Sequence, residues 1–509
     1  MKNVLYNTSI ADPFVKVAER LQKENGYEPV YWIGFNYDHS DEIVPKTFPK
    51  CIYQSYPDAW KGIFSKDIQE KAVECYLDVD LINELSRYEL QAMTMMNRLD
   101  YDRFSFNYME RERHYLNLIK SWTAVLDLYN INLVVSSVMP HRVYDYVLYL
   151  LCKKRGIKFV ILQYTLCPAR IYATDNVYSI GDMFVADYHK YLKEKNLKKE
   201  NLPDDLLKAF VTVQKSYDEA KPYYMNQHAQ KSKRYNNIFY YAKDYLKRYN
   251  LKGMLKVIKK GGVSVTMRKN RKYSLEDTRF SIIDILRIEL KKMSYNKTMR
   301  QYYQSLATEP VSGEKFVFFP LHYQPEASTS PTGDIFVNQR LCIETILKNT
   351  PDDWLVYVKE HPTQFHNHML GHTSRIKEFY KDLLKSKRVR LIPQEITSFN
   401  IMKNAKAVAT IIGTVGWEAV MHHIPVVMFG LFWYENMPGV LRITDAASAK
   451  GIKSFIDEYQ YDEQKVLAYL MSVSDNTVQA YHYAGEKELT SVSEGDSIEN
   501  IRKLILSYQ

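Results

Sequence analysis

The chain has 509 residues, of which 46% are apolar and 25% are charged, and its formal net charge is +10. Because a single hydrophobic core stops growing near ~250–300 residues, this length predicts at least two domains. The sequence contains no uninterrupted apolar run of about 18 residues, which argues against a transmembrane helix. The first residues lack the long apolar segment and cleavage site of a signal peptide, so we expect a cytoplasmic protein.

The first third of the chain alternates between strand and helix patterns. Residues 2–6 are strand-like, 14–23 are an amphipathic helix pattern that stops at Asn25-Gly26, and 29–34 are strand-like again. This strand–helix–strand order predicts a parallel sheet. A long helical region at 67–130 is followed by three further elements: strand 132–136, helix 144–154 and strand 158–163. We therefore predict a doubly wound α/β domain over residues 1–175.

Residues 176–310 lack this alternation and are predicted to be a basic helical insertion. Its most basic part, 231–272, holds fourteen Lys or Arg and one acidic residue, Asp244. Apolar residues recur among these cations at helical spacing, as in helices that lie on anionic membrane surfaces. We expect peripheral contact with the inner membrane; the alternative is a helix packed on the domains with a solvated basic face. No nucleic-acid-binding motif accompanies the charge, so nucleic acid is not expected as a partner.

Residues 311–445 return to the α/β alternation. Strand patterns occupy 315–321, 354–359, 389–392, 407–412 and 425–429, and helix patterns occupy 336–348, 374–384, 398–404 and the segment after Gly413. They predict a second doubly wound domain, followed by a helical tail, 446–509, that packs back on the domains. Two Rossmann-type domains facing across a cleft, with the basic helical insertion between them, make an α/β fold of the GT-B kind. In open α/β sheets, ligands bind beyond the carboxyl ends of the strands.

Polar groups follow the first two strands of this second domain. They are His322, Tyr323 and Gln324 after the first strand, and Lys359, His361 and Pro362 after the second. Lys can neutralise a phosphate, and His can donate a hydrogen bond to a phosphate oxygen. The alternatives are a solvated turn after the first strand, and a surface Lys359–Glu360 pair with a capping histidine after the second.

The fourth strand ends in a glycine-containing helix start, Gly413-Thr414-Val415-Gly416-Trp417-Glu418. The glycines allow a ligand to approach the backbone, and Thr414 is a possible N-cap of the helix. Helix N-termini favour phosphate, and Glu418 is placed to accept from ribose hydroxyls. The alternative is a capping box without a ligand.

The sequence gives little support for a metal or another cofactor. The five cysteines contain no C-x-x-C pair, and the one D-x-D pattern, Asp78-Val79-Asp80, falls in the helical region. His366, His368 and His372 do not follow helical spacing, which favours a histidine-rich surface loop over a metal site. We therefore expect activity without a metal and without a cofactor.

Several of these motifs together resemble a known family. The segments are Phe-Phe-Pro-Leu-His-Tyr-Gln-Pro-Glu at 318–326, Val-Lys-Glu-His-Pro at 358–362, Gly-Thr-Val-Gly-Trp-Glu-Ala at 413–419 and Pro-Val-Val-Met-Phe-Gly at 425–430. They resemble the bacterial capsule polysaccharide biosynthesis proteins, a group that includes the β-Kdo transferases that use CMP-Kdo. The resemblance implies that His361, Pro362, Gly413 and Thr414, with Glu418, face the donor nucleotide. It also implies a GT-B glycosyltransferase.

The N-terminal half does not match the acceptor motifs of those transferases, so the donor sugar stays open between a CMP-activated acidic sugar and a UDP-sugar. An inverting transferase needs a base to deprotonate the acceptor hydroxyl. The candidates at strand ends of the first domain are Asp12, His141 and Asp145, and Glu326 is the candidate on the second domain. Each of the first three has the alternative of a capping or surface role.

The function that we expect is that of a glycosyltransferase of bacterial surface polysaccharide synthesis. It would transfer a sugar from a nucleotide-sugar donor to a glycan or lipid-linked acceptor. Two alternatives stay open: a polyol-phosphate transferase like those of teichoic acid assembly, and a non-catalytic carbohydrate-binding component of a polysaccharide assembly complex.

Overall fold

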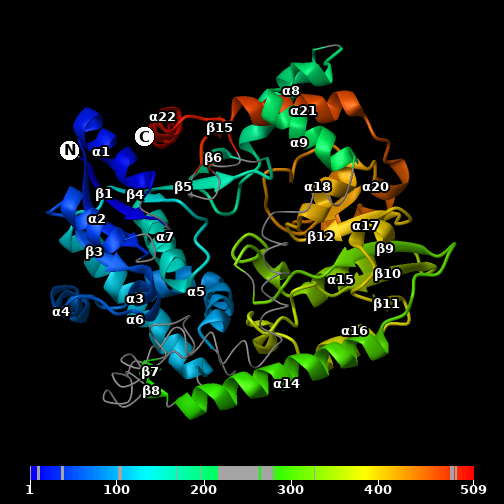
Figure 1. The fold of residues 1–509 in the computed structure, drawn as a ribbon, viewed down its shortest axis with the longest axis horizontal. Coiled ribbons are helices and arrows are strands. Elements are labelled where there is room, and N and C mark those ends of the chain that lie inside the picture. Colours follow the sequence, from blue (N-terminus) through cyan, green and yellow to red (C-terminus); the bar gives the residue numbers. More distant parts are fainter. Residues whose placement is uncertain are drawn as a thin grey trace.

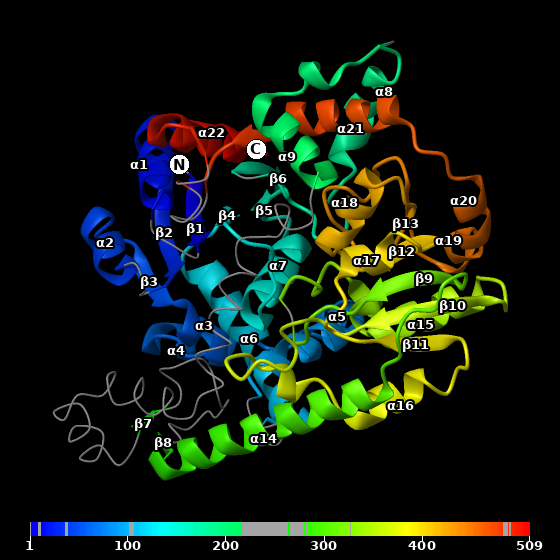
Figure 2. The same ribbon diagram turned by 45° about the vertical axis from the view of Figure 1, so that its right-hand side comes forward.

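The computed structural model describes residues 2–8, 12–35, 39–100, 106–167, 169–194, 196–215, 263–264, 279–280, 282–325, 327–481, 487 and 490–508. Two sheets form the cores of two α/β domains (Figures 1 and 2). The expected membrane-binding segment, 231–272, lies outside the described residues except for 263–264. None of the helices in the described part of the chain has the length and apolarity needed to cross a bilayer.

The N-terminal sheet has the strand order β15-β6-β5-β4-β1-β2-β3. Its parallel strands are β1 (Lys2–Asn7), β2 (Tyr27–Gly34), β3 (Ile52–Ser55), β4 (Leu133–Ser136) and β5 (Lys158–Tyr164), and its antiparallel edge is made by β6 (Arg170–Thr174) and β15 (Val478–Gln479). The four strands predicted in this region are therefore present. Three others, β3, β6 and β15, were not predicted, because each contains only one Val, Ile or Leu and so shows no apolar run.

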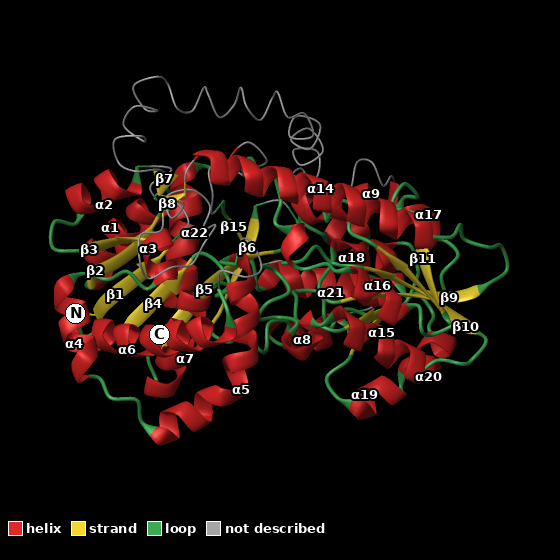
Figure 3. Ribbon diagram, turned by 90° about the horizontal axis from the view of Figure 1, so that it is seen from below, coloured by secondary structure: helices red, strands yellow, loops and turns green. Residues whose placement is uncertain are grey.

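Helices cover both faces of this sheet (Figure 3). They are α1 (Phe14–Asn25), α2 (Ser40–Thr47), α3 (Tyr56–Lys61), α4 (Lys66–Glu74), α5 (Val79–Met95), the 3₁₀ turn η2 (Met96–Arg98), α6 (Tyr108–Leu128) and α7 (Val143–Arg155). The predicted stop of α1 is confirmed: Gly26 has φ 69° and closes the helix by donating its N–H to Gln22. Asn107 and Glu110 start α6 with a capping box.

The middle of the chain crosses from one sheet to the other. Its described elements are α8 (Met183–Tyr191), η3 (Lys199–Asn201), α9 (Asp204–Lys215), β7 (Val263–Ser264), β8 (Arg279–Phe280) and α14 (Ile282–Leu306). The expectation of a strand-free segment is wrong in detail, since β7 and β8 pair with each other. Helix α14 runs from this ladder to α16 of the C-terminal domain (Figure 1).

The C-terminal sheet has the order β11-β10-β9-β12-β13-β14 and is parallel throughout. Its strands are β9 (Lys315–Pro320), β10 (Trp354–Lys359), β11 (Val389–Ile392), β12 (Ala407–Thr410), β13 (Val426–Met428) and β14 (Val440–Arg442). The five predicted strands are present, and β14 is an additional, half-buried edge strand. Both sheets thus contain the doubly wound 3-2-1-4-5 order of the Rossmann fold, and the predicted GT-B-like fold class is confirmed.

The helices of this domain are short. They are η5 (Asp334–Val337), α15 (Gln339–Lys348), η6 (Gly371–Thr373), α16 (Lys377–Leu383), α17 (Ser398–Met402), α18 (Thr414–Met421), α19 (Ala446–Lys450) and α20 (Ile452–Glu458). The predicted helices at 336–348 and 374–384 both start later than expected, because a 3₁₀ turn precedes each α-helix.

The last elements connect the two domains. Helix α21 (Glu463–Asp475) packs against α8 beside the C-terminal domain, whereas α22 (Glu494–Leu506) returns to pack along α1 (Figure 2). Arg170 on β6 forms a two-pronged ion pair with Asp205 on α9, and it also donates to Thr477. Polar contacts of Arg170 therefore link the described segments that pass between the two domains.

A contact between the domains also involves α5. Gln91 is buried, accepts a hydrogen bond from Tyr146 on α7 at 3.0 Å, and donates to the carbonyl of Pro331 at 2.9 Å. Pro331 belongs to the loop that follows β9. This contact fixes the N-terminal domain beside a loop of the C-terminal sheet's carboxyl edge.

Candidate functional site

Three predicted motifs meet at one edge of the C-terminal sheet. Strand β9 lies between β10 and β12, and all three run parallel, so the loops after them leave from the same edge. The chain reverses its direction of winding between β9 and β12, which is where open α/β sheets bind ligands. The tertiary structure therefore brings the segments at 321–325, 359–364 and 411–418 together.

His322 connects the ends of β9 and β12. Its Nε2 accepts the backbone N–H of Ile411 at 3.3 Å and lies 3.1 Å from the hydroxyl of Thr410. A backbone N–H can only donate, so in the neutral ring the proton is on Nδ1. The side chain of Gln339 holds both backbone groups of His322, accepting its N–H at 2.8 Å and donating to its carbonyl at 3.1 Å. His322 is 8% exposed and fixes the spacing of two loops.

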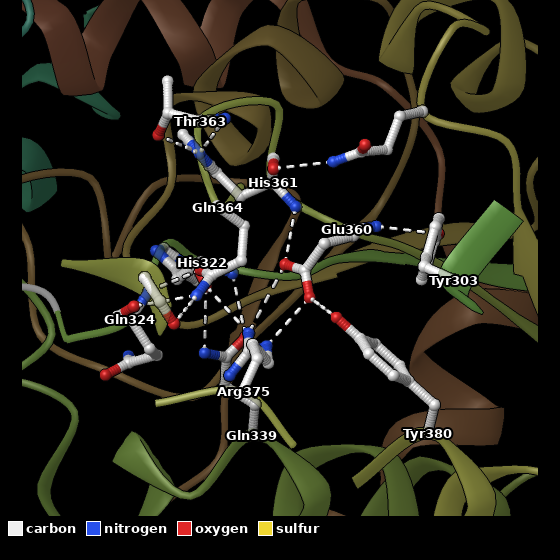
Figure 4. Close-up of polar contacts among 12 residues, drawn as sticks. Tyr303, His322, Gln324, Gln339, Glu360, His361, Thr363, Gln364, Arg375 and Tyr380 are labelled. Carbon is white, nitrogen blue, oxygen red and sulfur yellow. Dashed lines mark hydrogen bonds and ion pairs between the residues drawn. The ribbon is translucent and has the colours of Figure 1, made fainter. Parts of the chain in front are cut away.

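Tyr323 and Gln324 attach the loop after β9 to the segment after β10. The hydroxyl of Tyr323 accepts the N–H of Leu370 at 2.7 Å. Gln324 forms a reciprocal pair with the Gln364 side chain, which accepts its N–H and donates to its carbonyl, both at 2.9 Å (Figure 4). Gln364 also donates to the carbonyl of Gly371 at 3.0 Å. These contacts make the two loops one rigid unit.

A buried carboxylate anchors the His-Pro turn. Glu360 is fully buried, pairs with Arg375 Nε at 2.8 Å, and accepts a short hydrogen bond from the hydroxyl of Tyr380 (Figure 4). Its Oε1 accepts the backbone N–H of His361 at 2.8 Å, and its own N–H is bonded to Tyr303. The alternative of a surface Lys359–Glu360 pair is wrong, because Glu360 is paired with Arg375 in the interior.

His361 is oriented by the turn that it begins. Its Nδ1 accepts the N–H of Thr363 at 3.2 Å and lies 2.9 Å from the hydroxyl of the same residue (Figure 4). The neutral ring therefore carries its proton on Nε2, the nitrogen that faces away from the turn. Burial, then the charges of His322 and Lys359, lower the pKa of His361 to about 3. At neutral pH the ring is uncharged and presents one N–H donor.

The lysine at the end of β10 is also buried. Lys359 is 4% exposed, and burial lowers its pKa to about 8, against the opposing effect of Glu395. A phosphate beside it would favour the charged form. Next to this strand end, a pocket of about 140 Å³ is lined by Arg300, Pro362, Phe365, His366, Gln394 and Glu395. Gln394 donates to the carbonyl of His361 at 3.0 Å and so closes the turn from this side.

The helix start after β12 differs from the prediction in one residue. Gly413, not Thr414, is the N-cap of α18, so Thr414 is the first helical residue. The N–H of Gly413 donates to Thr410 at 2.9 Å, and its carbonyl accepts a short hydrogen bond from Tyr434. A Cβ on Gly416 would lie 2.6 Å from the Tyr434 hydroxyl. Gly416 is therefore required for packing of Tyr434, rather than for close approach of a ligand.

Glu418 follows Thr414 by one helical turn and is half-buried. Burial raises its pKa to about 7, and a hydrogen bond from the Thr414 hydroxyl opposes this shift. The pair places a hydroxyl and a carboxyl on one face of the first turns of α18. The groups at this edge that can offer an N–H or a positive charge to a ligand thus include the His361 Nε2–H, the Lys359 ammonium and the start of α18.

We expect Thr414→Val to weaken nucleotide binding about 2–10-fold, the worth of one neutral hydrogen bond, without lowering the melting temperature appreciably. Thr414 is not the cap, so its hydroxyl is not needed to start the helix. The matched control is Thr397→Val, which removes a true threonine N-cap from α17 and should lower stability by ~0.5–2 kcal/mol with affinity unchanged. Thermal melts and calorimetric titration with CMP and UDP check both variants. A stability loss without an affinity loss at Thr414 would contradict the binding role.

The three candidate bases of the N-terminal domain lie at the carboxyl edge of its sheet, but in different settings. Asp12 is exposed and lies 3.7 Å from the ammonium of Lys16. The same lysine also pairs with Glu494 on α22. Asp145 is fully buried in the first turn of α7 and accepts the N–H of Arg142 at 2.7 Å. Burial raises the pKa of Asp145 to about 7, and its hydrogen bond from the Arg142 N–H gives it a capping role at the start of α7. The structure brings His141 and Asp145 together but leaves Asp12 beside α22.

His141 is partly exposed in the loop between β4 and α7. Its Nδ1 lies 2.6 Å from the carbonyl of Met139, and a carbonyl can only accept, so Nδ1 carries the proton. The lone pair is then on Nε2, the arrangement that a general base needs. Burial, and then the charges of Arg142 and Arg98, lower the pKa of His141 well below its usual range.

The remaining predictions concern Glu326 and the histidine cluster. Glu326 lies outside the described residues. The histidine-rich segment is not an exposed loop as expected: His366 and His368 are half-buried, with rings 5.5 Å apart, and His372 is buried. Within the described part of the chain, no three His, Cys, Asp or Glu side chains are grouped as metal ligands.

Sequence reasoning missed the residues that hold the site in place. They are Tyr303, Gln339, Gln364, Arg375, Tyr380, Gln394 and Tyr434. Tyr303, Gln339 and Tyr380 lie on helices, whereas Gln364, Gln394 and Tyr434 lie in loops for which the sequence predicted no element. No local pattern distinguishes a polar residue that points into the sheet edge from one that points to solvent.

A model of the family described as capsule polysaccharide biosynthesis protein matches residues 200–474, more than half of the chain. No curated protein matches the chain.

Similar solved structures include two transferases of the KpsC protein of Thermosulfurimonas dismutans. The β-Kdo 2,7 transferase is 11% identical to this chain, with a TM-score of 0.29. The alignment covers 75% of this chain and 89% of the transferase chain. The β-Kdo 2,4 transferase is 10% identical, with a TM-score of 0.27, and the alignment covers 67% of this chain and 79% of the transferase chain. The UDP-GlcNAc 2-epimerase of Methanocaldococcus jannaschii is 13% identical, with a TM-score of 0.23, and the alignment covers 93% of this chain and 99% of the epimerase chain. From the family model, the chain belongs to the capsule polysaccharide biosynthesis protein family.

Proposed function

We propose that the chain is a glycosyltransferase of capsule polysaccharide synthesis that transfers a sugar from a nucleotide-sugar donor to a glycan or lipid-linked acceptor. The observation that carries this proposal is that three cation or N–H donors follow the carboxyl ends of β10 and β12, the strands on either side of β9 at the switch point of the C-terminal sheet. They are the Nε2–H of His361, the ammonium of Lys359 and the first turn of α18.

These groups suit a departing nucleotide phosphate. Sugar transfer builds negative charge on the phosphate oxygen that leaves the sugar, and fixed donors stabilise that charge without reorganising. His361 is held by Thr363 and Glu360, so its Nε2–H needs no further ordering when the donor binds. The carboxyl of Glu418 is one turn into α18 and is suited to accept from the ribose hydroxyls. A CMP-activated acidic sugar is the donor that we propose first, with a UDP-sugar second.

The acceptor hydroxyl must lose a proton, and we assign this step to His141. Its Nε2 lone pair is fixed by the Nδ1 contact with Met139. His141→Gln should lower kcat at least 10²-fold, the usual worth of a general base, while nucleotide affinity stays unchanged. An unaltered kcat would remove His141 from the mechanism and leave Asp12, Asp145 and Glu326 as candidates.

A donor screen tests the proposed function. CMP, UDP and CDP-glycerol are titrated into the protein, and the binding nucleotides are then offered as activated sugars with capsule oligosaccharide acceptors. Binding of CMP or UDP with sugar transfer supports a glycosyltransferase. Use of CDP-glycerol would instead show a polyol-phosphate transferase, and absence of nucleotide binding would show a non-catalytic carbohydrate-binding protein.

We expect transfer to survive treatment with EDTA, because protein cations and helix N–H groups take the place of a metal at the leaving phosphate. The measurement is the initial rate of transfer before and after chelation and dialysis. The control is the same assay with added Mg²⁺ or Mn²⁺, which should change the rate less than twofold. Complete loss on chelation, restored by either ion, would contradict this prediction.

A further inference from the structure

One buried amide spans the boundary between the two domains. Gln91 on α5 is 7% exposed. Its Nε2 donates to the carbonyl of Pro331, in the loop after β9, at 2.9 Å, and its Oε1 lies 3.0 Å from the hydroxyl of Tyr146 on α7. A carbonyl can only accept, so the orientation of the amide is fixed and the Tyr146 hydroxyl must donate to Oε1. Gln91 therefore uses one end of its amide for each domain.

The element that carries Gln91 also holds the loop of the candidate base. Helix α5 continues directly into η2, which ends at Arg98. Arg98 donates to the backbone carbonyl of His141. Tyr146, the partner of Gln91 in the N-terminal domain, lies on α7, the helix that begins just after His141. Figure 1 shows α5 on the side of the N-terminal domain that faces the C-terminal domain.

On the other side of the boundary, the loop that Gln91 contacts is bonded to the His-Pro turn. Within this loop, the side chain of Gln324 donates to the Thr329 hydroxyl at 3.2 Å. Gln324 is also the backbone partner of the Gln364 side chain (Figure 4), and the N–H of Gln364 donates to the carbonyl of His361 at 3.0 Å. Hydrogen bonds therefore connect the loop beside Gln91 to the residue that we place at the leaving phosphate.

The loop does not need Gln91 to keep its own shape. The carbonyl of Pro331 also accepts the N–H of Asp334 at 2.9 Å, a bond within the C-terminal domain. Loss of the Gln91 amide would therefore remove the contact with α5 and leave this turn bonded. A weaker electrostatic contact joins the same two segments. Burial raises the pKa of Asp334, and the charge of Arg87, one turn before Gln91 on α5, opposes this rise.

We propose that Gln91 is a positioning residue for sugar transfer, which holds the His141 loop of one domain at a fixed separation from the His361 turn of the other. This inference rests on the proposed function, because it takes these histidines as the base and as a donor to the leaving phosphate. A misplacement of ~1 Å between reacting groups can lower a rate about 10²-fold. Gln91 acts through the two loops, so its loss should lower turnover and leave the nucleotide site intact.

The test compares kcat and nucleotide affinity in Gln91→Met and in a matched control, Gln54→Met. Gln54 is 8% exposed, accepts from the Tyr31 hydroxyl at 2.8 Å and donates to the carbonyl of Ile63 at 2.7 Å, all within the N-terminal domain. Both variants lose the same two kinds of hydrogen bond, so their melting temperatures should fall to a similar extent. Only Gln91→Met should lower kcat, at least tenfold, with unchanged calorimetric affinity for CMP or UDP.

Gln91→Glu gives a readout that a merely structural role would not move. The carboxylate has the shape of the amide but no donor for the Pro331 carbonyl, whereas the protonated acid can donate to it. Burial raises the pKa of a carboxyl group, so the acid form should become populated as the pH falls from 8 to 6. The kcat of Gln91→Glu, divided by that of the wild-type protein, should therefore rise over this range. A ratio that does not depend on pH would contradict the assigned hydrogen bond.

The separation of the domains is measured independently of activity. Spin labels are placed at one exposed position of each domain, Tyr76→Cys and Val311→Cys, in a Cys75→Ser background, because the other four cysteines are buried. Pulsed electron resonance should give one narrow distance distribution for this protein. Adding Gln91→Met should broaden or shift the distribution, and adding Gln54→Met should leave it unchanged.

The outcomes separate this inference from the proposed function. Wild-type kcat or an unchanged distance distribution in Gln91→Met would overturn the inference and leave the proposed function standing. An equal fall of kcat in Gln54→Met, or weaker nucleotide binding in Gln91→Met, would show a general structural role and would also overturn it. Absence of sugar transfer by the wild-type protein would overturn the proposed function, and the spin-label distances would still decide whether Gln91 holds the domains in place.

Discussion

His361→Ala is expected to weaken nucleotide binding about 10–150-fold and to abolish sugar transfer, while the protein stays folded. A hydrogen bond to a charged phosphate is worth ~1.5–3 kcal/mol, which corresponds to this range of affinity. The ring also stabilises charge that develops on the leaving phosphate, so the effect on turnover should exceed the effect on binding. Calorimetric titration with CMP and UDP and the rate of transfer measure the two effects.

Two further variants at this position separate the two ring nitrogens. In His361→Asn, the amide oxygen can replace Nδ1 as acceptor for the Thr363 N–H, but nothing replaces Nε2. In His361→Gln, the longer amide can donate near the position of Nε2. We expect Asn to be as impaired as Ala, and Gln to retain part of the affinity. Full activity of His361→Asn would show that the ring orders the turn and does not touch the donor.

Glu360→Ala is expected to destabilise the protein by ~3–5 kcal/mol, because it leaves the Arg375 guanidinium buried without its counter-charge. Arg375 is 4% exposed, and Glu360 also accepts from Tyr380 and from the His361 N–H. A loss of this size should lower the melting temperature by roughly 10 °C for a domain of this size. Thermal and urea denaturation measure the change.

The matched control is Glu395→Ala. Glu395 pairs with Arg300 at 3.6 Å, but both side chains are more than half exposed, so this variant should lose under ~1 kcal/mol. The double variant Glu360→Leu with Arg375→Met removes both buried charges and should recover much of the loss. Equal melting of the Glu360 and Glu395 variants would contradict the buried-pair interpretation.

Most strands rich in aliphatic or phenylalanine residues could be predicted from the sequence, and strands with few of them could not. Strands such as β9 and β10 are continuous apolar runs, because both faces of a central parallel strand are covered by helices. β3 at the sheet edge has four residues, and its first residue, Ile52, is 38% exposed. β6 pairs antiparallel with β5, a pairing that depends on the turn between them. β3 and β6 each contain only one Val, Ile or Leu and so show no apolar run, whereas the four-residue β11 contains three of them and was predicted.

The gathering of the polar loops at one edge of the C-terminal sheet also followed from the sequence, because a parallel sheet puts all its carboxyl ends on one side. Polar residues after three successive strands therefore had to meet, and the segments at His322, His361 and Gly413 do so. The residue at which helix α18 begins could not be predicted from the sequence. Thr414 was the expected cap by residue type, but the backbone of Gly413 takes the extended conformation of an N-cap, with φ −68° and ψ 151°.

The sequence by itself determined the apolar runs, hence the two parallel sheets, and the residue types at their carboxyl edges. Only the tertiary structure decided which partners the polar residues there take. Glu360 and Lys359 are adjacent in sequence, yet Glu360 points into the core, toward Arg375 fifteen residues later, and Lys359 does not share that partner. The orientations of His361 and His141 depend on one backbone hydrogen bond each, from Thr363 and to Met139. Such contacts depend on the distance and direction between atoms brought together by folding, which composition and spacing along the chain do not specify.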